Sequence, residues 1–94
     1  MAKPAYSEDK ERILGRLRRI EGQVRGIHRM VEEERYCIDV LTQIAAVQAA
    51  LDRVALSLLD EHARHCVVCG KGPGDADERT TEMMAAVARL LKRG

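Results

Sequence analysis

The chain has 94 residues, contains no Trp and no Phe, and carries a formal net charge of +1. This length predicts one small domain (1–94), whose core of small side chains would be stable only with self-association. No apolar run is long enough to span a membrane and no signal-peptide core is present, so we expect a cytoplasmic protein without a membrane partner. The three cysteines are clustered, which favours metal or redox chemistry over a disulfide framework.

Residues 1–6 are predicted to form a flexible tail, followed by a helix over 7–34 that Ser7 would cap. The apolar residues of this helix repeat at spacings of four and three, which is typical of a heptad seam. They are Ile13, Leu17, Ile20, Val24, Ile27 and Val31. Between residues 10 and 29, seven basic residues outnumber two acids: Lys10, Arg12, Arg16, Arg18, Arg19, Arg25 and Arg29. This local excess predicts a basic patch.

A second helix is predicted over 36–66, because apolar and small residues recur there at alternating spacings of three and four. The stripe consists of Leu41, Ile44, Leu51, Ala55 and Leu58. Extended in both directions, it reaches Cys37, His62 and Cys66. At about 100° per residue, His62 and Cys66 each project within roughly 20° of Cys37, so all three are predicted to share one face.

These three side chains are candidate metal ligands, although each one alone is more typical of a buried structural residue. Cys37 and His62 would lie roughly 37 Å apart along a straight helix, so one chain cannot bring them together. A second copy packed antiparallel would place Cys37 of one chain beside His62 and Cys66 of the other, in two equivalent sites. Two thiolates and an imidazole are soft ligands, and three of them without a carboxylate favour Cu(I) over structural zinc.

Two features of this helix leave alternatives open. Gln48 interrupts the apolar stripe, and it would either approach its own copy in an antiparallel dimer or lie at an exposed edge. Cys66 and Cys69 form a C-x-x-C unit, which is typical of a redox pair or of half a zinc site. Because Cys69 lies beyond the expected helix end, we interpret it as accessory to the three-ligand set.

A cluster of glycines and a proline predicts a loop over 70–76, and a third helix is predicted over 77–92. Asp75 or Asp77 could cap this helix. Its apolar face would be made of Met83, Met84, Val87, Leu90 and Leu91. No phosphate-binding glycine loop and no nucleophile beside a substrate cleft is recognisable, so we expect no catalytic residue, no enzyme activity and no small-molecule substrate.

Over most of its length the chain closely resembles the CsoR/RcnR family of bacterial metal-responsive repressors, in the run RLRRIEGQVRGIHRMVEEERYCIDVLTQIAAVQAALDRVALSLLDEHARHC. Cys37, His62 and Cys66 match the fingerprint of its copper-sensing CsoR branch. The nickel- and cobalt-sensing branch has His at the position of Cys66, and the formaldehyde-responsive branch has a residue other than Cys there. The persulfide-sensing branch lacks the His that stands here at position 62.

The resemblance implies an all-α fold, with a three-helix protomer, an antiparallel four-helix-bundle dimer and a dimer-of-dimers homotetramer. It implies a repressor that binds operator DNA without metal and is released by Cu(I), which derepresses copper-resistance genes. Tyr36 and Glu82 match positions that hydrogen-bond around the metal-bound His.

The expected DNA-binding residues come from two sources. Arg16 and Arg53 match basic positions tied to DNA binding in the family, and the basic patch adds Lys10, Arg18 and Arg19. The alternative function is a thiol- or persulfide-sensing repressor of the same fold, which would use Cys37, Cys66 and Cys69.

Overall fold

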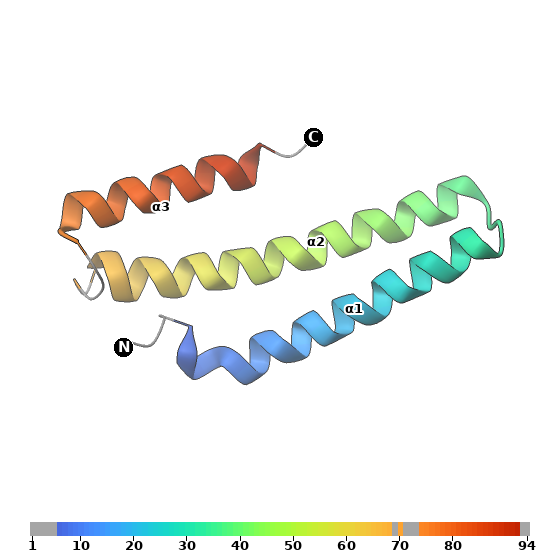
Figure 1. The fold of residues 1–94 in the computed structure, drawn as a ribbon, viewed down its shortest axis with the longest axis horizontal. Coiled ribbons are helices and arrows are strands. Elements are labelled where there is room, and N and C mark those ends of the chain that lie inside the picture. The colour runs from blue at the N-terminus through green and yellow to red at the C-terminus, as the bar shows by residue number, and fades with distance from the viewer. Residues whose placement is uncertain (1–5, 69, 71–73, 93–94) are drawn as a thin grey trace. The chain divides into compact units, whose positions relative to one another are not determined.

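The computed structural model is all-helical in the part of the chain that it describes, as Figure 1 shows. That part comprises residues 6–68, 70 and 74–92, of which 66–68 are described by their backbone alone. The long helices are α1 (Lys10–Glu32), α2 (Cys37–His62) and α3 (Ala76–Leu91), and the short ones are η1 (Ser7–Asp9), a 3₁₀ turn, and η2 (Ala63–Val68), a π-helix. The predicted all-α protomer with three helices is therefore confirmed.

The chain divides into two compact units, which we describe separately. The N-terminal unit, Glu8–Leu56, contains α1 and most of α2. Its buried hydrophobic side chains are Ile13, Ile20, Val47 and Val54, which are 5–8% exposed. In each helix the two buried residues are seven positions apart, as a heptad seam requires. The core is small, and none of its side chains is completely buried.

The ends of α1 are fixed by local hydrogen bonds. The backbone N–H of Glu34 donates to Val31 O and that of Arg35 donates to Met30 O, at 3.0 and 2.9 Å. This pair of bonds is a Schellman motif, and its left-handed position is Glu34, with φ of 56°. The motif ends α1 at Glu32, two residues before the predicted end at 34, and the turn that follows lies at Glu33–Arg35, where the three consecutive acids predict it.

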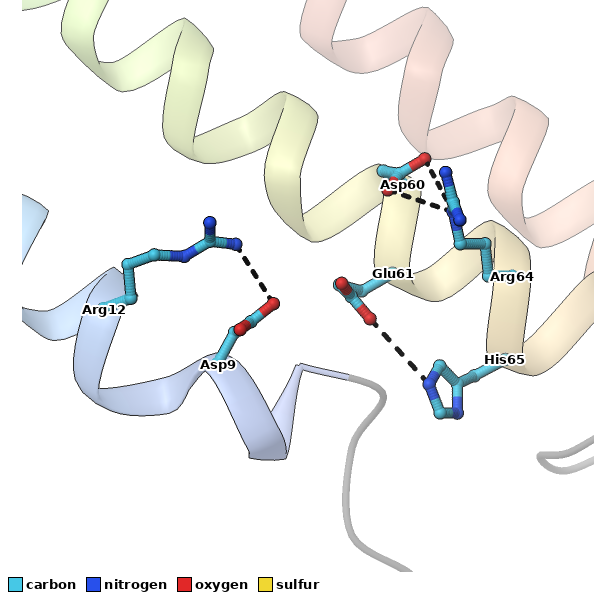
Figure 2. Close-up of polar contacts among 6 residues, drawn as sticks. All are labelled: Asp9, Arg12, Asp60, Glu61, Arg64 and His65. Carbon is cyan, nitrogen blue, oxygen red and sulfur yellow. Dashed lines mark hydrogen bonds and ion pairs between the residues drawn. The ribbon is translucent and has the colours of Figure 1, made fainter.

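The start of α1 differs from the prediction. Ser7 does not cap the helix: residues Ser7–Asp9 form η1, and Asp9 is the N-cap of α1, without a side-chain capping hydrogen bond. The carboxylate of Asp9 instead accepts a hydrogen bond from Arg12 Nη2 at 3.1 Å (Figure 2). The Asp9 side chain therefore contacts Arg12 and no helix N–H, and α1 begins three residues later than predicted.

The C-terminal unit contains the end of α2 from Ser57, η2 and α3. The helix predicted over 36–66 is α-helical only to His62, where it passes into the π-helix η2. α3 begins at Ala76 because the carboxylate of Asp75 accepts a hydrogen bond from Glu78 N–H at 2.8 Å. Of the two predicted caps, Asp75 is therefore the one used. η2 contacts α3.

None of the helices in the described ranges is both long enough and apolar enough to cross a membrane.

Candidate metal centre and nucleic-acid interface

Cys37 is the first residue of α2, and its thiol is free and exposed. Tyr36 precedes it, is 68% exposed, and accepts the first hydrogen bond of the helix from Val40 N–H at 3.2 Å. Tyr36 therefore acts as the backbone cap of α2, and it fixes Cys37 at the first helical position. A thiol held at this end of a rigid helix is accessible to a soft metal ion or to an oxidant.

His62 is the last residue of α2 and is half-buried. Residues on both sides of His62 contact one another across one helical turn: Arg64 Nε forms an ion pair with Asp60 Oδ2 at 3.2 Å, and His65 Nε2 lies 3.8 Å from Glu61 Oε2 (Figure 2). His62, at the last position of α2, is the imidazole that continues the stripe beginning at Cys37.

The third predicted ligand lies only partly within the described residues. The backbone of Cys66 belongs to η2, but its side chain, like the whole of Cys69, lies outside the described residues. A π-helix forms i→i+5 hydrogen bonds and turns less per residue than an α-helix, so the projection that placed Cys66 on the stripe does not apply beyond His62. The position of the Cys66 thiol remains a prediction. π-Helical turns occur frequently at functional sites.

The stripe that begins at Cys37 is not buried in the protomer. Leu41, Ile44 and Leu51 are 53%, 37% and 45% exposed, whereas Val47 and Val54 on the adjacent face of α2 are buried. α2 therefore has two apolar faces, of which one packs within the N-terminal unit and the other is available to a partner. Gln48, which lies on the available face, is exposed as well.

Among the described side chains, no group of three or more Cys, His, Asp and Glu residues converges as a metal site. Glu82 is exposed on α3, in the same unit as His62. Its role beside the metal-bound His, and that of Tyr36, remain predictions.

The basic patch of α1 resolves into an exposed stripe of arginines. Arg18, Arg25 and Arg29 are all exposed and project within about 40° of one another, roughly opposite the buried Ile20. The DNA-binding residues predicted from the sequence include Arg18 but not Arg25 or Arg29. Arg25 follows Arg18 by seven residues and Arg29 follows Arg25 by four. These helical spacings could have predicted that the three arginines share one face.

The other predicted DNA-binding residues are placed differently. Lys10, Arg19 and Arg53 are exposed, and Arg53 projects from the side of α2 opposite its exposed apolar stripe. Arg16 is half-buried and already interacts within the chain. A basic surface on α1 is therefore present, and the assignment of single residues to DNA remains a prediction.

The described residues thus form an all-helical protomer with an exposed cysteine, a basic helix and an uncovered apolar stripe. The chain belongs to the metal-sensitive transcriptional repressors, whose family model matches residues 9–93. This confirms the resemblance to the CsoR/RcnR family, and the family consists of repressors rather than enzymes.

Three similar proteins are all described as copper-sensing. The copper-sensing transcriptional repressor RicR of Mycobacterium tuberculosis is 59% identical over 90 residues, which cover 93% of each chain. The copper-sensing repressor CsoR of Bacillus subtilis is 50% identical over 86 residues, covering 92% of this chain and 85% of that one. The crystal structure of CsoR with Cu(I) from Geobacillus thermodenitrificans superposes with a TM-score of 0.82 at 48% identity, covering 90% of this chain and 88% of that one.

Proposed function

We propose that this protein is a Cu(I)-sensing transcriptional repressor, which binds operator DNA without metal and releases it when Cu(I) binds. The observation that carries the proposal is the exposed stripe of α2, which has a free thiol at its first residue and an imidazole at its last. The copper-sensing descriptions of three similar proteins support the choice of metal.

The donor set fits Cu(I). Cys37, His62 and Cys66 supply two sulfurs and one nitrogen, and soft ligands of this kind favour Cu(I), which accepts a low coordination number. Bound Cu(I) would link these three side chains by coordinating all of them. The chain's own contribution would be to supply Cys37 and His62 from the first and last residues of α2.

The ligands of one ion would come from two protomers. α2 has 26 residues, and at about 1.5 Å per residue Cys37 and His62 at its two ends lie roughly 37 Å apart along the axis. An antiparallel partner would place its own α2 along the exposed stripe, with Cys37 of one protomer beside His62 and Cys66 of the other. The symmetry of such a dimer creates two identical sites. The small core of the N-terminal unit supports association of this kind, and a dimer of dimers would complete the tetramer.

The basic surface of α1 is proposed to bind the operator. Arg18, Arg25 and Arg29 would contact phosphates along one face, with Lys10, Arg16, Arg19 and Arg53 as further contacts. Recognition would depend on phosphate charge and on DNA shape, because a broad arginine-rich face makes few contacts to base edges. Loss of this contact when Cu(I) binds would derepress the copper-resistance genes that the operator controls.

Tyr36 and Glu82 are proposed to hydrogen-bond around the ligating His62. The second ring nitrogen of a metal-bound imidazole normally donates to a neighbouring oxygen, which orients the ring and can report that the metal is bound. Glu82→Ala should then retain most of the Cu(I) affinity and lose part of the copper-induced release of DNA. Full release in this variant would exclude Glu82 from the response.

A mixed dimer tests the division of ligands between two chains. One protomer carries Cys37→Ser and the other carries Cys66→Ser, so an intersubunit arrangement leaves one complete site and destroys the other. We expect half of the wild-type Cu(I) stoichiometry at full affinity, measured by anaerobic competition with a Cu(I) chelator. The matched controls are the two homodimers, each of which should lose tight Cu(I) binding. If the mixed dimer also binds no Cu(I), the ligands come from the same chain and the assignment is wrong.

A further inference from the structure

We propose that Gly15 and Gly22 are positioning residues for the operator contacts of α1. Each glycine leaves free the part of the helix surface on which the guanidinium of a later arginine rests, with Arg18 over Gly15 and Arg25 over Gly22. The inference rests on the proposed function, because it takes the arginines of α1 as the groups that bind phosphates. All four residues belong to the N-terminal unit.

These four residues belong to a seven-residue repeat within α1. The segments GRLRRI (15–20) and GQVRGI (22–27) share a glycine, an aliphatic residue two positions later, an arginine three positions later and an isoleucine five positions later. Ile20 is buried and Ile27 is half-buried, whereas both arginines are exposed. Seven residues make almost two full helical turns, so the repeat places two glycine–arginine units on one face, about 10.5 Å apart along the axis.

Both arginine side chains fold back along the helix. Arg18 Nη2 lies 3.8 Å from the position that a Cβ on Gly15 would take, and Arg25 Nη2 lies 3.9 Å from the corresponding position on Gly22. Side chains of an α-helix lean toward its N-terminus, over the residues three and four positions earlier, so this direction is the expected one. A side chain longer than that of alanine at either glycine would therefore meet the guanidinium.

Arg29 shows that the spacing alone does not produce this contact. It follows Gly26 by three residues, as Arg25 follows Gly22. Among the described residues, however, no atom outside the local helix backbone lies within 4 Å of the position that a Cβ on Gly26 would take. Gly26 is therefore an open position on the same helix, with which Gly22 can be compared.

The charges of the two folded-back arginines are left available to phosphates. Glu21 stands three residues after Arg18 and four before Arg25, which are the spacings at which helical side chains form ion pairs. Within the described ranges it forms no ion pair with either arginine, whereas Arg12 is paired with Asp9 at 3.1 Å.

The benefit of this arrangement is pre-organisation. A guanidinium that already rests on the helix loses less side-chain freedom on binding a phosphate than an extended arginine does. Glycine is unfavourable in a helix interior, because it has the most backbone freedom to lose. A contribution to DNA binding would account for glycine at both positions, where no packing inside the protein requires it.

The test is metal-free operator binding by full-length Gly22→Leu, with Gly26→Leu as the matched control. Both substitutions add the same side chain to α1, and both raise its helix propensity. Gly22→Leu should displace the Arg25 guanidinium and weaken operator binding about three- to tenfold. Gly26→Leu, which enters open space, should bind like wild type. Gly22→Ala should do so as well, because its Cβ fits 3.9 Å from Arg25 Nη2.

A double-mutant cycle with Arg25→Ala separates displacement of the arginine from a direct clash with DNA. Because Gly22→Leu acts through Arg25, it should have no further effect in the Arg25→Ala background. The proposal is overturned if the two losses add, or if Gly22→Leu binds like wild type. It is equally overturned if Gly26→Leu or Gly22→Ala loses as much affinity as Gly22→Leu.

A measurement without DNA distinguishes this proposal from the proposed function. NMR relaxation of the arginine Nε–H groups in metal-free protein should show Arg18 and Arg25 more ordered than Arg29, and Gly22→Leu should make Arg25 mobile. Equal mobility of the three groups in wild type would overturn the role of the glycines, whatever the DNA affinities are. Ordered Arg18 and Arg25 in a wild-type protein that shows no salt-dependent operator binding would instead overturn the proposed function.

Discussion

Cys37 is hard to explain as a structural residue. A structural cysteine usually behaves as a small buried hydrophobe, whereas this thiol is exposed at the first position of a helix. In the protomer it contributes to no core, and it lies on the same apolar face as Leu41 and Ile44, which are exposed as well. The proposed partner, which would cover that face and bring other ligands to it, would account for an exposed thiol at this position.

Glu34 is the residue at which the backbone departs from ordinary geometry. Its φ of 56° places it in the left-handed region, which costs a residue with a Cβ about 1–2 kcal/mol relative to glycine. We therefore predict that Glu34→Gly raises the free energy of unfolding by about 1 kcal/mol, measured by urea titration at fixed protein concentration.

Glu33→Gly is the matched control for this prediction. Glu33 has φ of −85°, so glycine there relieves no strain and adds flexibility to the unfolded chain. It should lower the free energy of unfolding. Equal effects of the two substitutions would show that the left-handed conformation of Glu34 is not what limits stability.

Helix periodicity predicted the three helices but not all their ends. The seam containing Ile13 and Ile20 followed from heptad spacing, and the turn after α1 followed from three acids at a helix C-terminus. The start of α1 could not be predicted from the sequence, because Ser7 and Asp9 are both residue types that cap helices well. Only the structure shows that Asp9 is the N-cap and that its side chain is paired with Arg12. The π-helix from Ala63 was also unpredictable, since one extra residue per turn leaves no pattern in six residues.

The candidate sites were predictable to different degrees. The common face of Cys37 and His62 needed only the regular geometry of α2, and the structure places both on that one helix. Arg53 is the only Arg or Lys in α2, so no pattern of basic residues indicated a role for it, and only the family resemblance did. The proposed intersubunit site needs two chains, so the sequence of one chain cannot show it. The protomer supports it only through the exposed apolar stripe of α2.

The arginine stripe of α1 carries a prediction about DNA at the level of the element. Arg25→Ala should weaken metal-free operator binding and reduce the slope of log affinity against log salt by about one, because one phosphate contact and its released counterion are lost. Cu(I) affinity should not change. Fluorescence anisotropy at several salt concentrations measures the slope.

Arg12→Ala provides the comparison for that experiment. Arg12 belongs to the same helix but is paired with Asp9 at 3.1 Å and lies off the stripe. We expect it to change the salt slope less than Arg25→Ala does. A larger effect of Arg12→Ala would place the DNA on a different face of α1.

Self-association is the property of the whole molecule on which the proposed metal site would depend. Leu51 is 45% exposed near the middle of the stripe, and burying a leucine side chain contributes about 1.5–3 kcal/mol. In a symmetric dimer each substitution is present twice. We therefore predict that Leu51→Glu weakens dimerisation at least about 100-fold, measured by analytical ultracentrifugation, and also removes Cu(I) binding.

Leu56→Glu is the control for dimerisation. Leu56 is 59% exposed on the same helix but projects about 140° away from Leu51, off the stripe. It should remain at least dimeric and bind Cu(I). If Leu56→Glu gives monomers while Leu51→Glu stays dimeric, the interface lies on another face of α2, and Cys37 and His62 cannot meet as proposed.

The most direct test of copper sensing is a titration of the operator-bound protein with Cu(I) under anaerobic conditions, followed by fluorescence anisotropy. We expect release to be complete at one Cu(I) per protomer, and His62→Ala to remain bound to DNA. A persulfide or disulfide-forming oxidant in copper-free buffer should leave the wild-type complex intact. Release by the oxidant alone, with His62→Ala responding like wild type, would contradict copper sensing and establish the thiol-sensing alternative.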